Sequence, residues 1–265
     1  MTTRIAVSAG EPRARVDLLV GALAPRLISR TDRSARVALA AAGMLLLGGD
    51  RVHVDVTVGS GCRLELEDVG GTVAYPTRGT PSTWTLDIRV GSGGLLLWSG
   101  LPFVVAEGSD VERRTSIDLD VRARALVRET IVLGRHGEVG GHLASAFEVA
   151  DAGGPILHER LEVDGTVPEP GVLGDHRILD AVIAVGFRPD AGPRDLVLEQ
   201  PGAIARHLSA HAHESGLDAI WEAWAADALH TPIGVPNSSA RTVSVNGLNG
   251  FTSANQHQKD HPRRR

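Results

Sequence analysis

Apolar and polar residues alternate with a period of two along most of residues 1–200. Valines occupy every second position in Val52–Val58, and Trp84–Val90 and Ile117–Val121 alternate in the same way. Such alternation is typical of β-strands that are buried on one face. Glycine, proline, serine and aspartate, which favour turns, separate most of these segments. The pattern therefore predicts an all-β domain over residues 1–200.

The pattern changes near Gln200. Two stretches of apolar residues at helical spacing follow, one after Pro201 and one over Leu217–Leu229. The first stretch consists of Ile204, Ala205, Leu208 and Ala212. We expect two α-helices in a segment 201–235 that packs on or near the β domain. Residues 236–265 have little apolar content, so we expect a disordered tail. The chain has no repeat of fixed period, so we expect no simple solenoid.

Composition narrows the class of protein. With 265 residues and a mass of 27.9 kDa, the chain suits one large β domain or two small ones. Aromatic residues make up only 3% against 42% hydrophobic residues, so the core must consist mainly of Val, Leu, Ile and Ala. A net charge of −5 and a pI near 6.1 argue against nucleic acid as the main partner, because such binding needs a basic surface.

Cysteine usage and apolar runs bear on compartment. Cys62 is the single cysteine, which excludes an internal disulfide and a cysteine-cluster metal site. The first residues lack the basic and apolar regions of a secretory signal. The longest apolar run, Val37–Leu47, is interrupted by Gly43 and is shorter than the roughly 20 residues that span a bilayer. We expect a cytoplasmic protein without a membrane-bound part.

Two segments combine a glycine turn with charged residues beside a strand-like stretch. The first is LLLGGDRVHVD at Leu45–Asp55, where Gly48 and Gly49 precede Asp50. The second is ETIVLGRHGE at Glu129–Glu138, with a turn formed by Gly134, Arg135 and His136. Glycine lets the backbone turn where a side chain would clash. Taken singly, each motif is compatible with a structural turn in which the carboxylate accepts hydrogen bonds from nearby backbone N–H groups.

Glu129 stands out because of the face on which it lies. In Arg124–Leu133 it shares the apolar side of the strand with Val127 and Ile131. A carboxylate there is costly unless it is hydrogen-bonded, paired or bound to a cation. Two interpretations stay open. Glu129 forms a structural ion pair with Arg128, Arg135 or another arginine, or it is an interior ligand that helps a cation to pass.

Other residues raise weaker possibilities. On the expected first helix, His207 and His211 would share one face and could bind Ni²⁺ or Zn²⁺. No HExxH motif of a zinc hydrolase, P-loop or GxSxG elbow is present. The strand histidines form no HxH pair, which argues against a cupin-like metalloenzyme; they are His53, His142 and His158. Trp221 and Trp224, on the apolar stripe of the second expected helix, belong either to the core or to a docking face for a partner.

The two turn motifs, in this order and in an all-β frame, resemble the D/H family of urease accessory proteins. The resemblance covers about Arg15 to Gly165 and includes WSGLPFVV at Trp98–Val105. It implies a β-helix-like stack of strands with a couple of helices. It also implies a non-enzymatic scaffold that binds the accessory proteins F and G, of which G is a GTPase, and apo-urease. Ni²⁺ would be a transient cargo, with no permanently bound cofactor.

The resemblance also implies roles for particular residues. Asp50, Glu129 and Glu138 match positions that would line a nickel route, while Gly134 and Arg135 would shape the turn. The family pattern differs at Ala74 and Leu101, where polar residues are more common, so Glu65, Glu67 and Asp68 are candidate substitutes, with His136 weaker. The alternative is a β-sheet ligand-binding or interaction module, such as a carbohydrate-binding domain, without a metal role.

Overall fold

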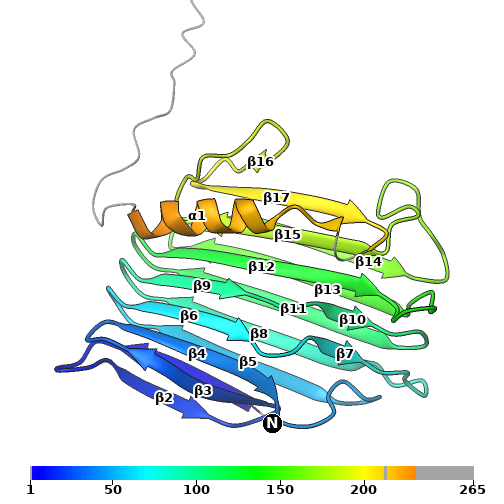
Figure 1. Ribbon diagram of the computed structural model, residues 1–265, viewed down its shortest axis with the longest axis horizontal. Helices are drawn as coiled ribbons and strands as arrows, with labels where there is room; N and C mark the ends of the chain where they lie inside the picture. The colour runs from blue at the N-terminus through cyan, green and yellow to red at the C-terminus, as the bar shows by residue number, and fades with distance from the viewer. Residues whose placement is uncertain (1, 212–213, 231–265) are drawn as a thin grey trace, which may run out of the picture. The chain divides into compact units, whose positions relative to one another are not determined.

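The computed structural model describes residues 2–211 and 214–230, which belong to one compact unit, Met1–Val235. Two β-sheets lie face to face (Figure 1). The first sheet has seven strands in the order β14-β13-β11-β8-β5-β1-β2. They are β1 (Thr2–Ser8), β2 (Arg15–Leu19), β5 (Arg51–Val58), β8 (Ser82–Val90), β11 (Asp110–Leu119), β13 (His142–Asp151) and β14 (Gly154–Asp164).

The second sheet has ten strands. Eight follow the order β16-β17-β15-β12-β9-β6-β4-β3, while the short strand β10 pairs with β12 and the short strand β7 pairs with β10. The strands are β3 (Leu23–Arg30), β4 (Ser34–Ala41), β6 (Arg63–Asp68), β7 (Thr72–Ala74), β9 (Leu95–Ser99), β10 (Phe103–Val105), β12 (Arg124–Leu133), β15 (Ile178–Val185), β16 (Leu196–Val197) and β17 (Gly202–Ser209). The prediction of a mainly β protein built from stacked sheets is confirmed.

The chain alternates between the two sheets, so that β5, β8 and β11 of the first sheet are each followed by a strand of the second. Consecutive turns of this coil stack with parallel strands, as in β5–β8–β11–β13 and β4–β6–β9–β12. One coil runs from Arg51 on β5 to Thr83, its partner on β8, and the next coil runs from Thr83 to Glu112, its partner on β11. The coils thus differ in length, which explains why the sequence has no repeat of fixed period.

The main core lies between the sheets and comes from the strand alternation. Val52, Val54, Val56 and Val58 of β5 are all buried, whereas His53, Asp55 and Thr57 lie on the outer face. Buried valine, leucine, isoleucine and alanine predominate in this layer, as the composition predicts. Full burial of one valine or leucine side chain stabilises the stack by about 1.5–3 kcal/mol.

The prediction of a first helix after Pro201 is wrong. Gly202–Ser209 forms β17, which pairs antiparallel with β15, so that Ile204 is opposite Ile183. Ile204 faces the main core, while Ala203 and Ala205 are buried on the opposite face. A segment buried on both faces loses its alternation, and periodicity then cannot distinguish a strand from a helix. Strands therefore continue past residue 200, and Ala212, which the same prediction included, lies outside the described residues.

Helix α1 (Asp218–His230) covers part of the outer face of the second sheet (Figure 1). Trp224 and Ala228 pack against Leu126 and Val182 in a second apolar cluster. The Trp224 indole Nε1 donates a hydrogen bond to the Asp190 carbonyl at 3.3 Å. Among the described residues, no helix combines the length and the apolar character that a membrane span requires. The expected disordered tail, residues 236–265, lies outside the described part of the chain.

Candidate functional site

The GGD turn and the GRHGE turn both connect the second sheet to the first, so they lie at the same end of the stack. In the first turn the Asp50 Oδ2 accepts a hydrogen bond from the Leu47 N–H at 2.9 Å. Gly49 has φ of +85°, a left-handed conformation that favours glycine, and its N–H donates to the Thr80 carbonyl at 3.2 Å. A Cβ on Gly48 would lie 3.4 Å from backbone atoms of Thr77 and Thr80, in the loop between β7 and β8. The half-buried Asp50 thus fastens its own turn.

The second turn is held by Glu138. Its carboxylate forms an ion pair with the Arg135 guanidinium at 2.6 Å. It also accepts hydrogen bonds from the backbone N–H of Arg135 at 2.9 Å and from that of Glu107 at 3.1 Å. The side-chain hydrogen bond from Arg135, followed by these backbone bonds, lowers the pKa of Glu138 to about 2. Gly134 has φ of +73°, and a Cβ there would lie 2.7 Å from the Gly140 nitrogen. His136 is exposed.

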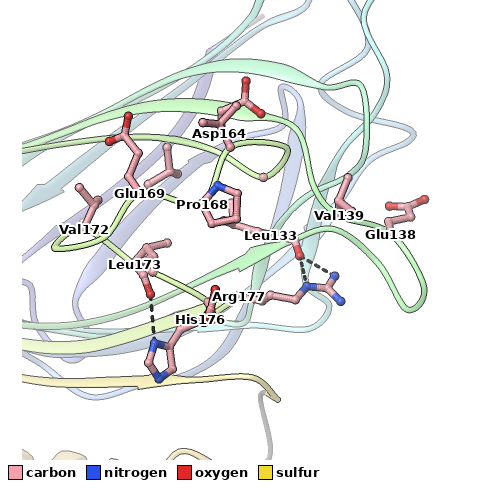
Figure 2. A pocket seen from close by; sticks show the side chains of 15 residues that line it. Leu133, Glu138, Val139, Asp164, Pro168, Glu169, Val172, Leu173, His176 and Arg177 are labelled. Atoms are coloured by element: carbon pink, nitrogen blue, oxygen red, sulfur yellow. Dashed lines mark hydrogen bonds between the residues drawn. The ribbon is translucent and has the colours of Figure 1, made fainter.

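A surface pocket of about 260 Å³ adjoins this second turn (Figure 2). Its apolar lining includes Leu133 and Leu173, and its carboxylates include Glu138 and Glu169. The Arg177 guanidinium beside it donates to the Leu133 carbonyl at 2.9 and 2.6 Å. Arg177 therefore stabilises the end of β12 rather than offering a free charge to the pocket.

Glu129 lies on the inner face of β12, the face that the alternation predicts. Its carboxylate pairs with Arg113 Nη2 and accepts a hydrogen bond from Thr115 Oγ1 at 3.3 Å. Only 14% of the Glu129 side chain is exposed. Of the two interpretations from the sequence, the ion pair is present, and its partner is neither Arg128 nor Arg135 but Arg113 on β11 of the opposite sheet.

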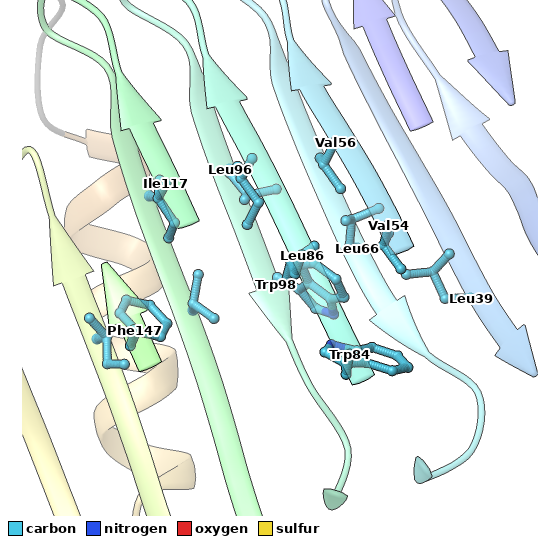
Figure 3. Packing of buried hydrophobic residues seen from close by; sticks show 14 of the residues in the cluster. Leu39, Val54, Val56, Leu66, Trp84, Leu86, Leu96, Trp98, Ile117 and Phe147 are labelled. Atoms are coloured by element: carbon cyan, nitrogen blue, oxygen red, sulfur yellow. The ribbon is translucent and has the colours of Figure 1, made fainter. Parts of the chain in front are cut away.

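Two small cavities meet at Glu129. One, of about 50 Å³, is lined by Asp68, Trp98 and Arg113 among others. The other, of about 30 Å³, is lined by Glu159 and Arg206 among others. Glu129 and Ile131 line both cavities. Figure 3 shows the surrounding layer, with Trp84 and Trp98 between the sheets. The interior of the stack therefore has carboxylates along consecutive hollow spaces.

Asp68, at the end of β6, is the candidate substitute that faces this interior. Its Oδ1 accepts the Trp98 indole N–H at 3.2 Å, and its Oδ2 accepts the Leu101 N–H at 3.0 Å. Burial raises the pKa of Asp68, and these two hydrogen bonds together with the charge of Arg113 oppose that rise. The carboxylate thus lies at the edge of the larger cavity, held by donors on two sides.

Glu65 and Glu67, by contrast, lie on the outer face of β6. Glu65 pairs with Arg63 at 3.1 Å, and Glu67 pairs with Arg36 at 2.5 Å. Alternate side chains of a strand point to opposite faces, and Asp68 lies two residues after Leu66, on the inner face with Leu64 and Leu66. The structure therefore brings Asp68 and Glu129 to the inside and leaves Asp50, Glu138 and His136 at one end of the stack.

Two buried charged groups were not predicted from the sequence. Arg113 occupies the inner face of β11, where Val111, Thr115 and Ile117 are buried. Extending the alternation of Ile117–Val121 by four residues towards the N-terminus would have found it. The second group is Asp180, which is fully buried in β15 between the partly buried Leu179 and the buried Ala181. No periodic signal distinguishes Asp180, because both faces of this strand are covered.

Asp180 binds the outward-facing Arg128 beneath α1. Arg128 Nη2 donates to Asp180 Oδ2 at 2.8 Å, while Thr130 Oγ1 and Ser215 Oγ donate at 2.9 and 2.6 Å. Burial alone would raise the pKa of Asp180, but hydrogen bonds from Arg128 and Ser215 and the charge of Arg128 outweigh it and lower the pKa. Arg128 also pairs with Asp218 at 2.5 Å, which anchors the start of α1.

The prediction that His207 and His211 share one face of a helix is wrong. His207 lies on strand β17, and His211 follows the end of that strand. Within residues 2–211 and 214–230, no group of three or more His, Cys, Asp or Glu side chains is arranged to hold a metal ion. Trp224 is 2% exposed and packs in the core under α1, with Trp221 partly buried beside it. Their role in partner docking stays a prediction.

Comparison with known proteins identifies the family. The model of the UreD urease accessory protein family matches residues 23–237. Urease accessory protein UreD 1 of Streptomyces griseus is 42% identical over 215 residues, which cover 78% of this chain and 84% of the relative. UreD of Frankia alni is 36% identical over 192 residues, covering 62% of this chain and 64% of the relative. The chain therefore belongs to the UreD urease accessory protein family.

Proposed function

We propose that this protein is a non-enzymatic scaffold that passes Ni²⁺ towards apo-urease, together with the accessory proteins F and G. The observation that carries the proposal is the interior position of Glu129, a carboxylate that lines two consecutive cavities between the sheets. Oxygen ligands of this kind bind divalent cations. Membership in the UreD family supports urease as the recipient.

In this proposal the ion is a cargo that moves between single carboxylates. Asp68 and Glu129 would each offer one carboxylate to the same cavity, and Glu159 would offer another to the next. Sites with few ligands suit transfer, because a passing ion must bind firmly enough to enter and weakly enough to leave. Asp50 and Glu138 would act at one end of the stack, where they hold the two connecting turns.

The test begins with urease from cells that lack this protein. We expect urease to be made but to be poor in nickel and inactive, and wild-type protein should restore the nickel content. Nickel-replete urease in the deletion strain would instead favour an interaction module without a metal role. Metal analysis of purified urease is the measurement, because it is independent of catalytic assays.

Variants then test the route itself. Glu129→Ala should lower urease nickel more than Asp50→Ala, because Glu129 lines the interior and Asp50 fastens a turn. Soluble amounts of each variant must match wild type for the comparison to hold. Co-purification from the cytosol with urease and a GTPase tests the partners, and their absence under conditions that preserve known complexes would contradict the scaffold role.

A further inference from the structure

Arg113 is the buried charge whose hydrogen-bonding capacity is least used. Its side chain is 8% exposed, and Nη2 donates to Glu129. Its Nε and Nη1 atoms are buried and have no hydrogen-bond partner among the described residues. The guanidinium lies over the Phe103 ring, with Cζ at 5.5 Å from the ring centre. Buried donors without acceptors are rare and costly, so this arrangement requires an explanation.

The surroundings of Arg113 supply a second acceptor. Arg113 lines the larger cavity together with Asp68 and Glu129. Its charge acts on Asp68, where it opposes the rise in pKa that burial causes. One guanidinium therefore lies within electrostatic range of two interior carboxylates and is hydrogen-bonded to one of them. Asp68 is held in place by hydrogen bonds from Trp98 and Leu101, one to each carboxylate oxygen, and each oxygen can accept a further donor.

This arrangement has a consequence for any cation between the sheets. The Arg113 guanidinium repels a cation that approaches Glu129, because like charges a few ångströms apart interact strongly at the effective dielectric of a protein. Pairing with Arg113 therefore weakens the binding of a divalent ion to Glu129.

We propose that Arg113 is a displaceable counter-cation that occupies Glu129 in the isolated protein and frees it for Ni²⁺ by moving towards Asp68. The inference rests on the proposed function and adds the residue that controls access to the route. In the closed arrangement, Arg113 excludes cations from the one carboxylate that lines both cavities. In the open arrangement, its unused N–H groups gain acceptors at Asp68 while Glu129 turns to the ion.

The test measures Ni²⁺ affinity of the purified full chain by competition with a chromophoric chelator. Arg113→Met removes the charge and keeps an apolar side chain of similar length, so Ni²⁺ should bind about tenfold more tightly or better. Arg113→Lys keeps the charge and should resemble wild type. In the double variant Arg113→Met, Glu129→Gln, the gain should disappear, because the carboxylate that was exposed is gone.

Arg114→Met is the matched control. Arg114 follows Arg113 on β11 and pairs with Glu148 of β13 on the outer face of the first sheet, so this variant also removes an arginine from an ion pair but leaves both cavities unchanged. We expect a change in Ni²⁺ affinity of less than about threefold, because Glu129 stays paired with Arg113. Equal tightening in both variants would show that any lost positive charge suffices and would overturn the specific role of Arg113.

Folding is monitored by near-ultraviolet circular dichroism, and Arg113→Gln replaces the methionine variant if that one is insoluble. Unchanged Ni²⁺ affinity in a folded Arg113→Met or Arg113→Gln protein overturns the proposal, as does a gain that survives Glu129→Gln. These outcomes concern the isolated chain. Failure of nickel delivery would instead appear as nickel-replete urease in the deletion strain, so the two failures are distinguishable.

Discussion

The two faces of strand β12 carry ion pairs of opposite character at neighbouring positions. On the outer face, Arg128 binds Asp180, which also accepts hydrogen bonds from Thr130 and Ser215 beneath α1. On the inner face, Glu129 binds Arg113, which keeps two buried nitrogens without a hydrogen-bond partner among the described residues and lies beside a cavity. The outer pair is enclosed by protein donors, whereas the inner pair borders empty space.

This difference separates a structural pair from one that can exchange partners. Every additional donor to Asp180 favours its charged form in one fixed geometry, so moving any member costs several hydrogen bonds. Movement of Arg113 away from Glu129 costs one ion pair and brings unused donors towards another acceptor. Burial of charge by itself therefore does not indicate function, while incomplete pairing next to a cavity does.

The largest expected effect comes from breaking the outer pair. Asp180→Ala leaves Arg128 without its buried partner and should lower the free energy of unfolding by about 3–5 kcal/mol. Urea unfolding followed by circular dichroism is the measurement. Asp218→Ala, which removes an exposed partner of the same arginine, should cost less than about 1 kcal/mol. Similar losses in both variants would contradict the view that Asp180 is the centre of the network.

Glu129→Gln should have a smaller effect on stability and a larger one on nickel delivery. The amide oxygen still accepts from Arg113 and Thr115, so the free energy of unfolding should fall by about 1–3 kcal/mol. Nickel per urease should fall because the amide is a weaker ligand than the carboxylate. Asp180→Asn serves as comparison, since it weakens the outer pair without touching the route. If both variants lost urease nickel in proportion to their loss of stability, the inner and outer ion pairs of β12 would not differ in function.

Two threonines compare the faces without removing a charge. Thr130→Val deletes a hydrogen bond of 2.9 Å to Asp180 and should cost about 1–2 kcal/mol. Thr115→Val deletes a longer bond of 3.3 Å to Glu129 and should cost less than that. Thermal unfolding of the two variants under identical conditions gives the ranking. The reverse order would mean that the inner pair is the more tightly held one.

The smallest expected effect concerns the surface ion pair between Glu138 and Arg135, which acid titration tests. The folded pKa of Glu138, about 2, lies below its ordinary value of 4.5. The pairing therefore stabilises the fold above pH 4.5, and this contribution is lost as the pH falls towards 2. The difference in melting temperature between wild type and Glu138→Gln should be constant near neutral pH and vanish near pH 2. A difference that persists at pH 2 would show that the amide disturbs the turn by itself.

The sequence by itself determined the strands in which apolar and polar residues alternate and the face that each of their residues takes, because a side-chain period of two is a local property of the backbone. It thereby placed Glu129 inside, and the same parity separates Asp68 from Glu65 and Glu67. Only the tertiary structure decided that Gly202–Ser209 is a strand, since burial on both faces hides its period. It also decided that Arg113 is the partner of Glu129, because pairing across two sheets depends on how the coils stack and not on either strand alone.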